Sequence, residues 1–326
     1  MTGVQLLEIA ADDGDVRLDR FLKRRFPGLT QGQLQKFLRT GQVRVDGRRV
    51  EASLRLQPGQ TVRVPPLADT PAPARPPARP AALRPDEAER VRALVLHDDG
   101  AVVALAKPAG LAVQGGTKTT QHLDRWLPAL DQGGERCRLV HRLDRDTAGL
   151  LLLGRGAGPA AKLTEAFRRG QVRKLYWAVV HGRVAERQGI VDLRLAKVGG
   201  AGNERVVGDD GGKPAKTLFR VVARAGKVAT WLALRPITGR THQLRVHLAA
   251  IGHPILGDRK YADGQAPLTG QPDGLMLFAR TASLPHPQGG TLTLTAPLAP
   301  HLDACFDWLG FTEDMAAEDG LEAFEL

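Results

Sequence analysis

The chain has 326 residues, of which 42% are hydrophobic and 25% are charged, a composition typical of a folded globular protein. A domain usually takes about 100–200 residues, so two or three domains are expected. The leucine run of residues 150–153 is far shorter than the ~20 residues of a membrane-spanning helix, and the first residues lack the basic start of a secretory signal. Two cysteines, Cys137 and Cys305, are too few for a disulfide framework or a zinc site of several thiolates. These features indicate a cytoplasmic protein without a membrane span.

The charge is strongly positive and unevenly distributed. The whole chain carries +11, but residues 281–326 contain eight acidic residues and no lysine or arginine, so the remainder carries +19. A body this basic indicates a polyanionic partner, of which nucleic acid is the commonest. Arginine makes up 35 of the 46 basic residues, which suits phosphate recognition, although a GC-rich genome would produce the same bias.

The first 65 residues contain two helices with clear sequence signals. Apolar residues at helical spacing predict a helix over residues 18–26. Thr30 followed by Gln33 is a capping box, which predicts a second helix through about Arg39. Gly41 is expected to end this helix.

A small basic sheet is expected after these helices. Alternating valines flank Asp46-Gly47, a dipeptide typical of two-residue hairpin turns, Val50 lies on the expected return strand, and a last strand is expected over residues 61–64. The stretch RLDRFLKRRFPGLTQGQLQKFLRTGQVRVDGRRV resembles the S4 domain, which implies RNA binding; a small αβ domain with a solvated basic surface is the alternative. The side chains expected to bind RNA here are Arg20, Arg24, Lys36 and Arg39.

Proline dominates the next segment, which separates the first unit from the rest. Residues 66–90 include PLADTPAPARPPARPAALRP, and repeated prolines remove N–H donors and fix φ, so an extended linker is expected. Residues 91–310 are expected to form a large domain. The acidic residues 311–326 are expected to form a solvated tail.

The large domain mixes helices and strands without strict alternation, which favours an α+β fold over a doubly wound α/β fold. No internal repeat is apparent. Strands are expected over residues 91–97, 101–107, 174–184, 218–222, 228–234 and 275–279, and helices over residues 159–169 and 242–251.

The strongest local signal for chemistry is LVHRLDRDTAGL, which starts at Leu139. It places Asp144 among apolar residues and beside Arg142 and Arg145. A carboxylate near apolar walls is costly unless a cation keeps it charged, and a charged, partly dry carboxylate is a good nucleophile or base. A structural Asp–Arg pair is the alternative.

The segment RPITGRTHQLRVHLAAIGHPILG supplies cations and imidazoles. Arg240 and Arg245 lie around the start of a predicted helix, where they can reach a phosphate or Asp144. His242 and His247 are five residues apart, whereas two histidines that share a metal on a helix are four apart. Packed or hydrogen-bonded histidines are therefore expected rather than a metal site.

Tyr176 lies in the predicted strand RKLYWAVV, directly after a basic turn. An aromatic ring beside arginines suits stacking on an unpaired base. A tyrosine in a strand is also an ordinary core residue, so this signal depends on its neighbours.

Four motifs in chain order resemble the RluA family of pseudouridine synthases: AKPAGLAV, HRLDRDT-x-G, RKLYWAVVHG, and RPITGRTHQLRVH followed by GHPILGD. The match runs through most of residues 91–285. The S4-like N-terminus and the segment NERVVGDDGGKPAKT most closely resemble the RluC branch, which modifies large-subunit ribosomal RNA. The resemblance implies an α+β domain with a mixed, largely antiparallel sheet that converts uridine to pseudouridine in RNA, with 23S ribosomal RNA as the expected substrate.

The resemblance also implies roles for individual residues. Asp144 is the catalytic aspartate, Tyr176 packs on the flipped uracil, and Arg245 pairs with Asp144. Arg142 enters the RNA stack that the uridine leaves, and Arg240 contacts RNA.

Two residues of the family motifs have no predicted role in the reaction. Lys107 belongs to the first motif without an assigned role. Ala148 stands where the family usually has serine, so one local hydrogen bond is expected to be missing while the role of Asp144 is kept.

Isomerisation breaks the N1–C1′ bond and rejoins uracil through C5 without redox change, so no metal, nucleotide or thiol cofactor is expected. The expected partner is RNA, and a monomer is expected. A transfer-RNA substrate remains an alternative, as does a non-catalytic RNA-binding assembly factor, although the intact Asp144, Tyr176 and Arg245 argue against the latter. A nucleotide-binding enzyme is a weaker alternative, because residues 154–158 have the spacing GxGxG rather than GxGxxG.

Overall fold

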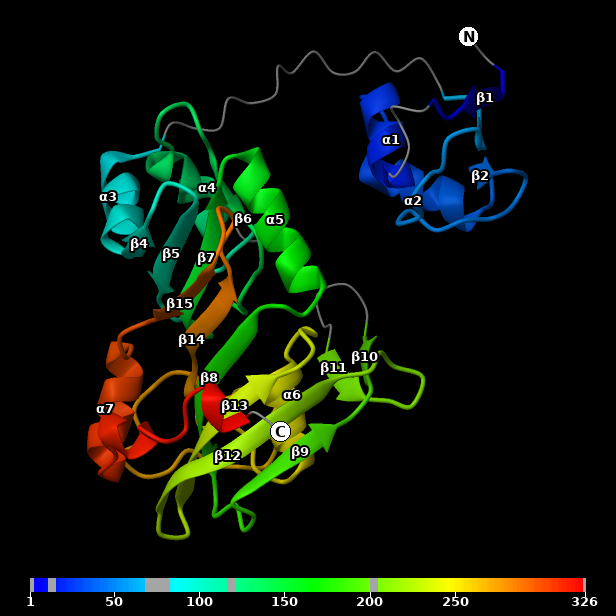
Figure 1. Ribbon diagram of the computed structural model, residues 1–326. Coiled ribbons are helices and arrows are strands. Elements are labelled where there is room, and N and C mark those ends of the chain that lie inside the picture. Colours follow the sequence, from blue (N-terminus) through cyan, green and yellow to red (C-terminus); the bar gives the residue numbers. More distant parts are fainter. Residues whose placement is uncertain (1–2, 11–15, 68–82, 116–120, 200–204, 325–326) are drawn as a thin grey trace. The chain divides into compact units, whose positions relative to one another are not determined.

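The computed structural model separates into two compact units, Met1–Ala82 and Leu83–Leu326 (Figure 1). Most of the predicted linker, and the first two residues of NERVVGDDGGKPAKT, lie outside the described residues. Within the described ranges, no helix combines the length and the apolar character needed to cross a membrane. The structure describes residues 3–10, 16–67, 83–115, 121–199 and 205–324.

The first unit packs two helices against a three-stranded antiparallel sheet of order β1-β3-β2. The capping box is confirmed, because Thr30 accepts the backbone N–H of Gln33 and the Gln33 side chain accepts that of Thr30. Asp46 and Gly47 both have positive φ, as a hairpin turn of this kind requires. The elements are β1 (Gln5–Glu8), α1 (Leu18–Arg25), α2 (Gln31–Arg39), β2 (Arg44–Val45) and β3 (Thr61–Val64).

The expected return strand through Val50 is wrong. After the turn, only an isolated bridge joins Val45 to Arg48, and Val50 lies outside any strand. Strand β2 pairs with β3 instead, and β3 pairs on its other side with β1, which the sequence did not predict. Leu22, Leu34 and Val62 are fully buried in the core between this sheet and the helices.

The second unit is built on one ten-stranded sheet of order β4-β5-β7-β14-β8-β13-β12-β9, with β15 beside β14 and β6 beside β7. Its strand pairs are antiparallel except for β7 and β14, so the predicted α+β class with a mixed sheet is confirmed. The strands are β4 (Val95–Asp98), β5 (Val102–Lys107), β6 (Cys137–Leu139), β7 (Ala148–Arg155), β8 (Arg173–His181), β9 (Gln188–Asp192), β12 (Lys216–Ala225), β13 (Ala229–Pro236), β14 (Leu277–Pro285) and β15 (Thr291–Thr295), together with a separate hairpin of β10 (Leu195–Val198) and β11 (Arg205–Gly208).

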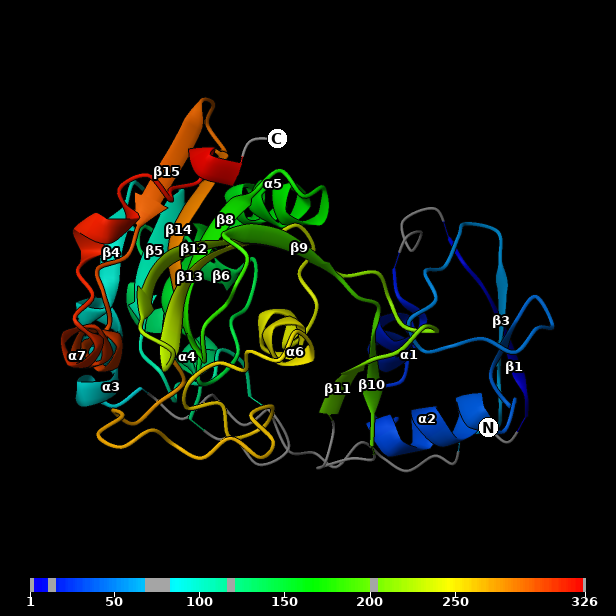
Figure 2. The same ribbon diagram turned by 90° about the horizontal axis from the view of Figure 1, so that it is seen from below.

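Helices cover both faces of this sheet. Helix α5 packs on β7, and Figure 2 shows β9, β12 and β13 arching around α6. Two apolar cores form on opposite faces, because alternate residues of β7 enter different ones: Leu150 and Leu152 one core, Leu151 and Leu153 the other. The helices are α3 (Pro85–Ala93), α4 (Leu123–Trp126), α5 (Ala157–Arg168), α6 (Gln243–Ala250) and α7 (Pro300–Leu309), with 3₁₀ helices over Leu127–Leu130, Glu313–Ala316 and Glu322–Phe324.

The start of the large unit differs from the sequence prediction. Residues 85–93 form α3, where the end of the linker and the first strand were expected, and the strand starts only at Val95. Pro85 suits the first helical position, and the buried carboxylate of Glu87 accepts the backbone N–H of Arg84 at the helix start. These contacts at the start of α3 favour a helix over residues 91–93, where the sequence pattern predicted a strand.

The acidic C-terminal segment is packed against the domain, so the predicted solvated tail is wrong. Phe311, Leu321 and Phe324 are buried in the larger core. Arg173 donates to the carbonyl oxygen of Leu321, and Arg235 donates to that of Phe324. Apolar residues spaced through the acidic stretch therefore anchor it, and basic side chains from the sheet satisfy its backbone.

The centre of the sheet brings two distant motifs into register. Ala279 on β14 lies opposite Gly149 on β7 and opposite Tyr176 on β8. Gly149 has φ +111, and a Cβ there would overlap the carbonyl oxygen of Ala279, so only glycine permits this approach. The loop that precedes β7 and carries Asp144 is thereby placed beside Tyr176.

Candidate active site

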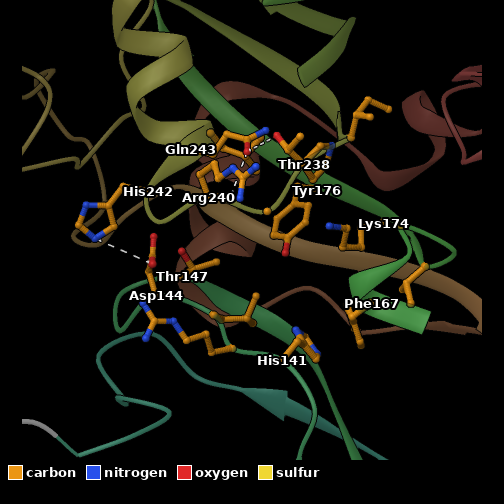
Figure 3. A pocket seen from close by; sticks show the side chains of 18 of the residues that line it. His141, Asp144, Thr147, Phe167, Lys174, Tyr176, Thr238, Arg240, His242 and Gln243 are labelled. Carbon is orange, nitrogen blue, oxygen red and sulfur yellow. Dashed lines mark hydrogen bonds and ion pairs between the residues drawn. The ribbon is translucent and has the colours of Figure 1, made fainter. Parts of the chain in front are cut away.

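A cavity of about 650 Å³ opens at this point of the large unit. Its walls come from the loop before β7, from the end of α5 with the start of β8, and from the turn that leads into α6 (Figure 3). The cavity brings together the sequence-predicted residues of the large unit: Arg142, Asp144, Tyr176, Arg240 and Arg245.

Asp144 stands at one end of the cavity, with 23% of its side chain exposed. Its Oδ1 lies 3.9 Å from Nε2 of His242. Tyr176 lines the same space, and burial together with the negative charge of Asp144 raises the pKa of its phenol, so the hydroxyl stays protonated. The two residues thus share one partly dry space, as the sequence predicted.

Lys107 fixes the loop on the C-terminal side of Asp144. Its ammonium is buried and donates to the carbonyl oxygens of Pro108 at 2.8 Å, Leu111 at 2.8 Å and Arg145 at 2.9 Å. Burial lowers its pKa to about 8, while the charges of two nearby aspartates oppose this shift. The sequence predicted no role for Lys107. A lysine at the end of a buried strand nevertheless indicates a buried ammonium that needs acceptors.

Arg245 does not form the predicted pair with Asp144. Its Nε and Nη2 donate to the carboxylate of Asp258 at 2.8 and 2.7 Å, and both side chains are buried. Burial alone would lower the pKa of Arg245, but these hydrogen bonds and the charges of Asp258 and Asp144 raise it. The predicted direct pair of Arg245 with Asp144 is therefore wrong. Arg245 lies within the electrostatic reach of Asp144 but binds Asp258.

Asp258 holds Arg245 beside the cavity, a contact that the sequence did not predict. It directly follows Gly257, whose φ is +75 and whose missing Cβ makes room for the carbonyl oxygen of Gly274. Asp258 also accepts the backbone N–H groups of Lys260 and Tyr261. Asp258 ends the motif GHPILGD, but the motif alone does not indicate which cation binds it.

The opposite end of the cavity is lined by His141, Phe167 and Lys174 (Figure 3). His141 stacks on Phe167 with ring centroids 4.4 Å apart, and its Nε2 accepts the backbone N–H of Leu152. Burial and the charge of Lys174 lower the pKa of His141 to about 3. The imidazole is therefore a neutral, flat part of the wall.

The two histidines near the start of α6 have different surroundings. His242 bonds to the Oη of Tyr261 at 2.7 Å, and His247 is fully buried in α6. In the part of the chain that the structure describes, no cluster of three or more His, Cys, Asp or Glu side chains could hold a metal ion. The predicted hydrogen-bonded histidine is confirmed for His242.

The remaining motif positions are explained by packing. Ala148 is fully buried in the larger core, so this position offers an apolar site rather than a polar one. A Cβ at Gly154 would overlap the backbone of Ala160, and one at Gly156 would meet the Glu135 carboxylate. Gly154 therefore allows α5 to pack closely on β7, and the close contacts of both glycines explain the glycines by packing.

The predicted RNA-binding residues of the first unit lie on its two helices. Arg20 and Arg24 belong to α1, and Lys36 and Arg39 belong to α2. All four side chains are exposed. Their binding to RNA stays a prediction.

Comparisons with known proteins agree with this geometry. Residues 101–250 match the family described as RNA pseudouridylate synthase, and residues 16–62 match the S4 domain. The chain is 35% identical to ribosomal large subunit pseudouridine synthase C of Salmonella typhi over 94% of this chain and 97% of that protein. It is also 35% identical to the protein of the same name from Vibrio cholerae, over 93% and 96%. Among solved structures, human RNA pseudouridylate synthase domain containing 4 is similar with a TM-score of 0.59 and 29% identity, over 68% of this chain and 95% of that one.

Proposed function

Since the chain belongs to the RNA pseudouridylate synthase family, we propose that it isomerises uridines to pseudouridine in the RNA of the large ribosomal subunit. The observation that carries this proposal is the meeting of Asp144 and Tyr176 in one cavity of the large unit. The names of its relatives and the S4 match support ribosomal RNA as the substrate. The charge of +11 suits a polyanion of this size.

The reaction moves one glycosidic bond. The N1–C1′ bond breaks, uracil turns within the site, a C5–C1′ bond forms, and the proton at C5 is lost while N1 gains one. The target base must first leave its stack, which costs a few kcal/mol. Arg142, exposed at the mouth of the cavity, fills the space in the stack, and Tyr176 packs on the flipped uracil.

Asp144 supplies the carboxylate at the sugar. Its partial burial strips away water that would otherwise solvate the charge, which makes it more effective as a nucleophile towards C1′ or as a base towards the ribose. A cavity of about 650 Å³ falls in the range that encloses a whole small molecule, so it holds the detached uracil while the ring turns.

The two alternatives receive less support. A non-catalytic assembly factor would not need a carboxylate held beside a stacking tyrosine in a cavity. A transfer-RNA substrate is less well supported because the relatives named above are large-subunit enzymes. We further propose a cytoplasmic location, because the relatives are named for the large ribosomal subunit, and a monomeric state, which light scattering in solution tests.

Asp144→Asn is the direct test. Tritium release from ribosomal RNA labelled with [5-³H]uridine should fall by about 10²–10⁴-fold, since a positioned acid–base or nucleophilic group contributes on this order. The dissociation constant for the RNA should stay within about threefold. Asp146→Asn is the matched control, because Asp146 lies on the same loop but is 55% exposed and faces Arg145.

Two outcomes would count against the proposal. Wild-type activity in Asp144→Asn would remove Asp144 from the chemistry. Pseudouridine maps of ribosomal RNA that are identical with and without the gene would remove the large ribosomal subunit as the substrate.

A further inference from the structure

His242 has a backbone conformation that its sequence does not favour. It lies directly before α6 with φ 53 and ψ 17, in the left-handed region where a Cβ is crowded. Among the described residues, the other non-glycine with positive φ is Asp46, which occupies a hairpin turn where this is common. A strained residue persists where its surroundings hold it, and such residues cluster at functional sites.

The hydrogen bonds of Tyr261 favour one tautomer of His242 over the other. The Oη of Tyr261 accepts the backbone N–H of Val206 at 3.2 Å and lies 2.7 Å from Nδ1 of His242. A phenol oxygen can accept two hydrogen bonds, so Nδ1 could also donate to it, but only a bond in which Oη donates to Nδ1 gives the phenol hydrogen a partner at this contact. Nδ1 is then the acceptor, and the imidazole proton sits on Nε2, the atom that faces Asp144.

The Tyr261 ring is held firmly for this purpose. It is buried, and the guanidinium groups of Arg245 and Arg205 lie 5.1 and 5.3 Å from its centroid. The His242 ring meets it edge-on at 5.5 Å. Burial also lowers the pKa of His242, against the opposing charge of Asp144, so the imidazole is neutral at pH 7.

The geometry points to His242 as a positioning residue. Tyr261 orients the imidazole of His242, and the Nε2–H of that imidazole fixes the orientation of the Asp144 carboxylate. This inference rests on the proposed role of Asp144. The present separation of 3.9 Å is longer than a hydrogen bond, and such contacts often tighten only when substrate binds. When the imidazole binds Oδ1 of Asp144, Oδ2 remains available to the ribose. The left-handed backbone of His242 places its ring next to Asp144.

His242→Asn and Tyr261→Phe test the arrangement. Asparagine tolerates the left-handed backbone but is too short to reach Asp144, and phenylalanine removes only the hydroxyl. Each variant should lower the single-turnover rate of tritium release by about 10- to 100-fold, as expected for a hydrogen bond to a charged group, with RNA affinity within about threefold. The double variant should be no slower than the slower single variant, because both act through one contact.

His286→Asn is the matched control. His286 also faces a carboxylate, with Nε2 3.2 Å from Asp99, but it lies outside the cavity lining. It should keep the wild-type rate. If His242→Asn keeps the wild-type rate, if the two single effects multiply, or if the loss appears in RNA affinity instead of rate, the inference is refuted while the role of Asp144 stands.

A second measurement does not depend on activity. In ¹⁵N-histidine spectra of the full chain, the signal that disappears in His242→Asn should report a proton on Nε2 and none on Nδ1. Tyr261→Phe should shift that signal towards a mixture of tautomers. A proton on Nδ1 in the wild-type protein would refute the relay whatever the substrate proves to be.

Discussion

Replacing Arg245 should destabilise the large unit strongly. The Asp258 side chain has 0% exposure, and Arg245 gives it two hydrogen bonds. Methionine fills much of the same volume but leaves the buried carboxylate without its cation. Removing one partner of a buried ion pair costs about 3–5 kcal/mol, because the remaining charge loses its compensation. Arg245→Met should therefore lower the free energy of unfolding by about that amount.

Urea unfolding followed by tryptophan fluorescence measures this loss of stability in the large unit alone. The four tryptophans of the chain lie between residues 126 and 308, so the signal reports only the large unit. Arg205→Met is the matched control. Arg205 also lies over the Tyr261 ring and pairs with an aspartate, Asp263, but this pair is 40% and 73% exposed. Exposed pairs contribute about 0–1 kcal/mol, so the control should lose no more than that.

The result also separates two accounts of Arg245. If Arg245 served Asp144 directly, as the sequence alone suggested, Arg245→Met would lose turnover while its stability changed by less than about 1 kcal/mol. That outcome would refute the reasoning from the Asp258 pair. A loss of several kcal/mol would support it.

Three further outcomes are expected. Lys107→Met should lower the free energy of unfolding by about 2–4 kcal/mol, because three carbonyl oxygens lose a charged donor, and it should slow turnover; unchanged urea curves would contradict this. His141, with a folded pKa of about 3 against an ordinary value of 6.5, takes up its proton only in the unfolded chain as the pH falls below 6.5, so stability should drop by up to about 1.4 kcal/mol per pH unit. His141→Gln should show a shallower drop in urea titrations between pH 7 and 5, and an equal drop would assign the acid sensitivity elsewhere. Alanine at Arg20, Arg24, Lys36 and Arg39 together should reduce the slope of log affinity against log salt by about 3, because each lost phosphate contact removes about 0.7–0.9, and an unchanged slope would exclude these side chains from the RNA interface.

Features set by near neighbours in the chain were predictable. The capping box at Thr30 and the turn at Asp46-Gly47 depend on contacts within three or four residues, and both are confirmed. The presence of Asp144 and Tyr176 in one cavity followed from motif resemblance, which carries information about the fold that local patterns lack. The motifs therefore predicted which residues of the large unit share a cavity, while their roles stay predictions.

Contacts between distant segments were not predictable. The partner of Arg245 depends on how the turn after Gly257 folds back on α6, and several acidic residues satisfied the pattern equally well. The packed C-terminal segment was missed because its charge was more conspicuous than the spacing of Phe311, Leu321 and Phe324. The conformation of His242 leaves no trace in composition or periodicity, since left-handed backbone at a histidine is decided by tertiary contacts.

Two cations lie near the Asp144 carboxylate without a direct bond to its oxygens. A cation bonded directly to Asp144 would occupy the lone pairs that the reaction needs. Instead, Arg245 gives two donors to Asp258, and Lys107 gives its three to backbone carbonyls, so both act on Asp144 through space. Both cations lie within electrostatic reach of Asp144, because its negative charge raises the pKa of Lys107 and of Arg245 against the effect of burial. Arg245 is thus held beside the site by its bond to Asp258, and neither Arg245 nor Lys107 occupies the oxygens of Asp144.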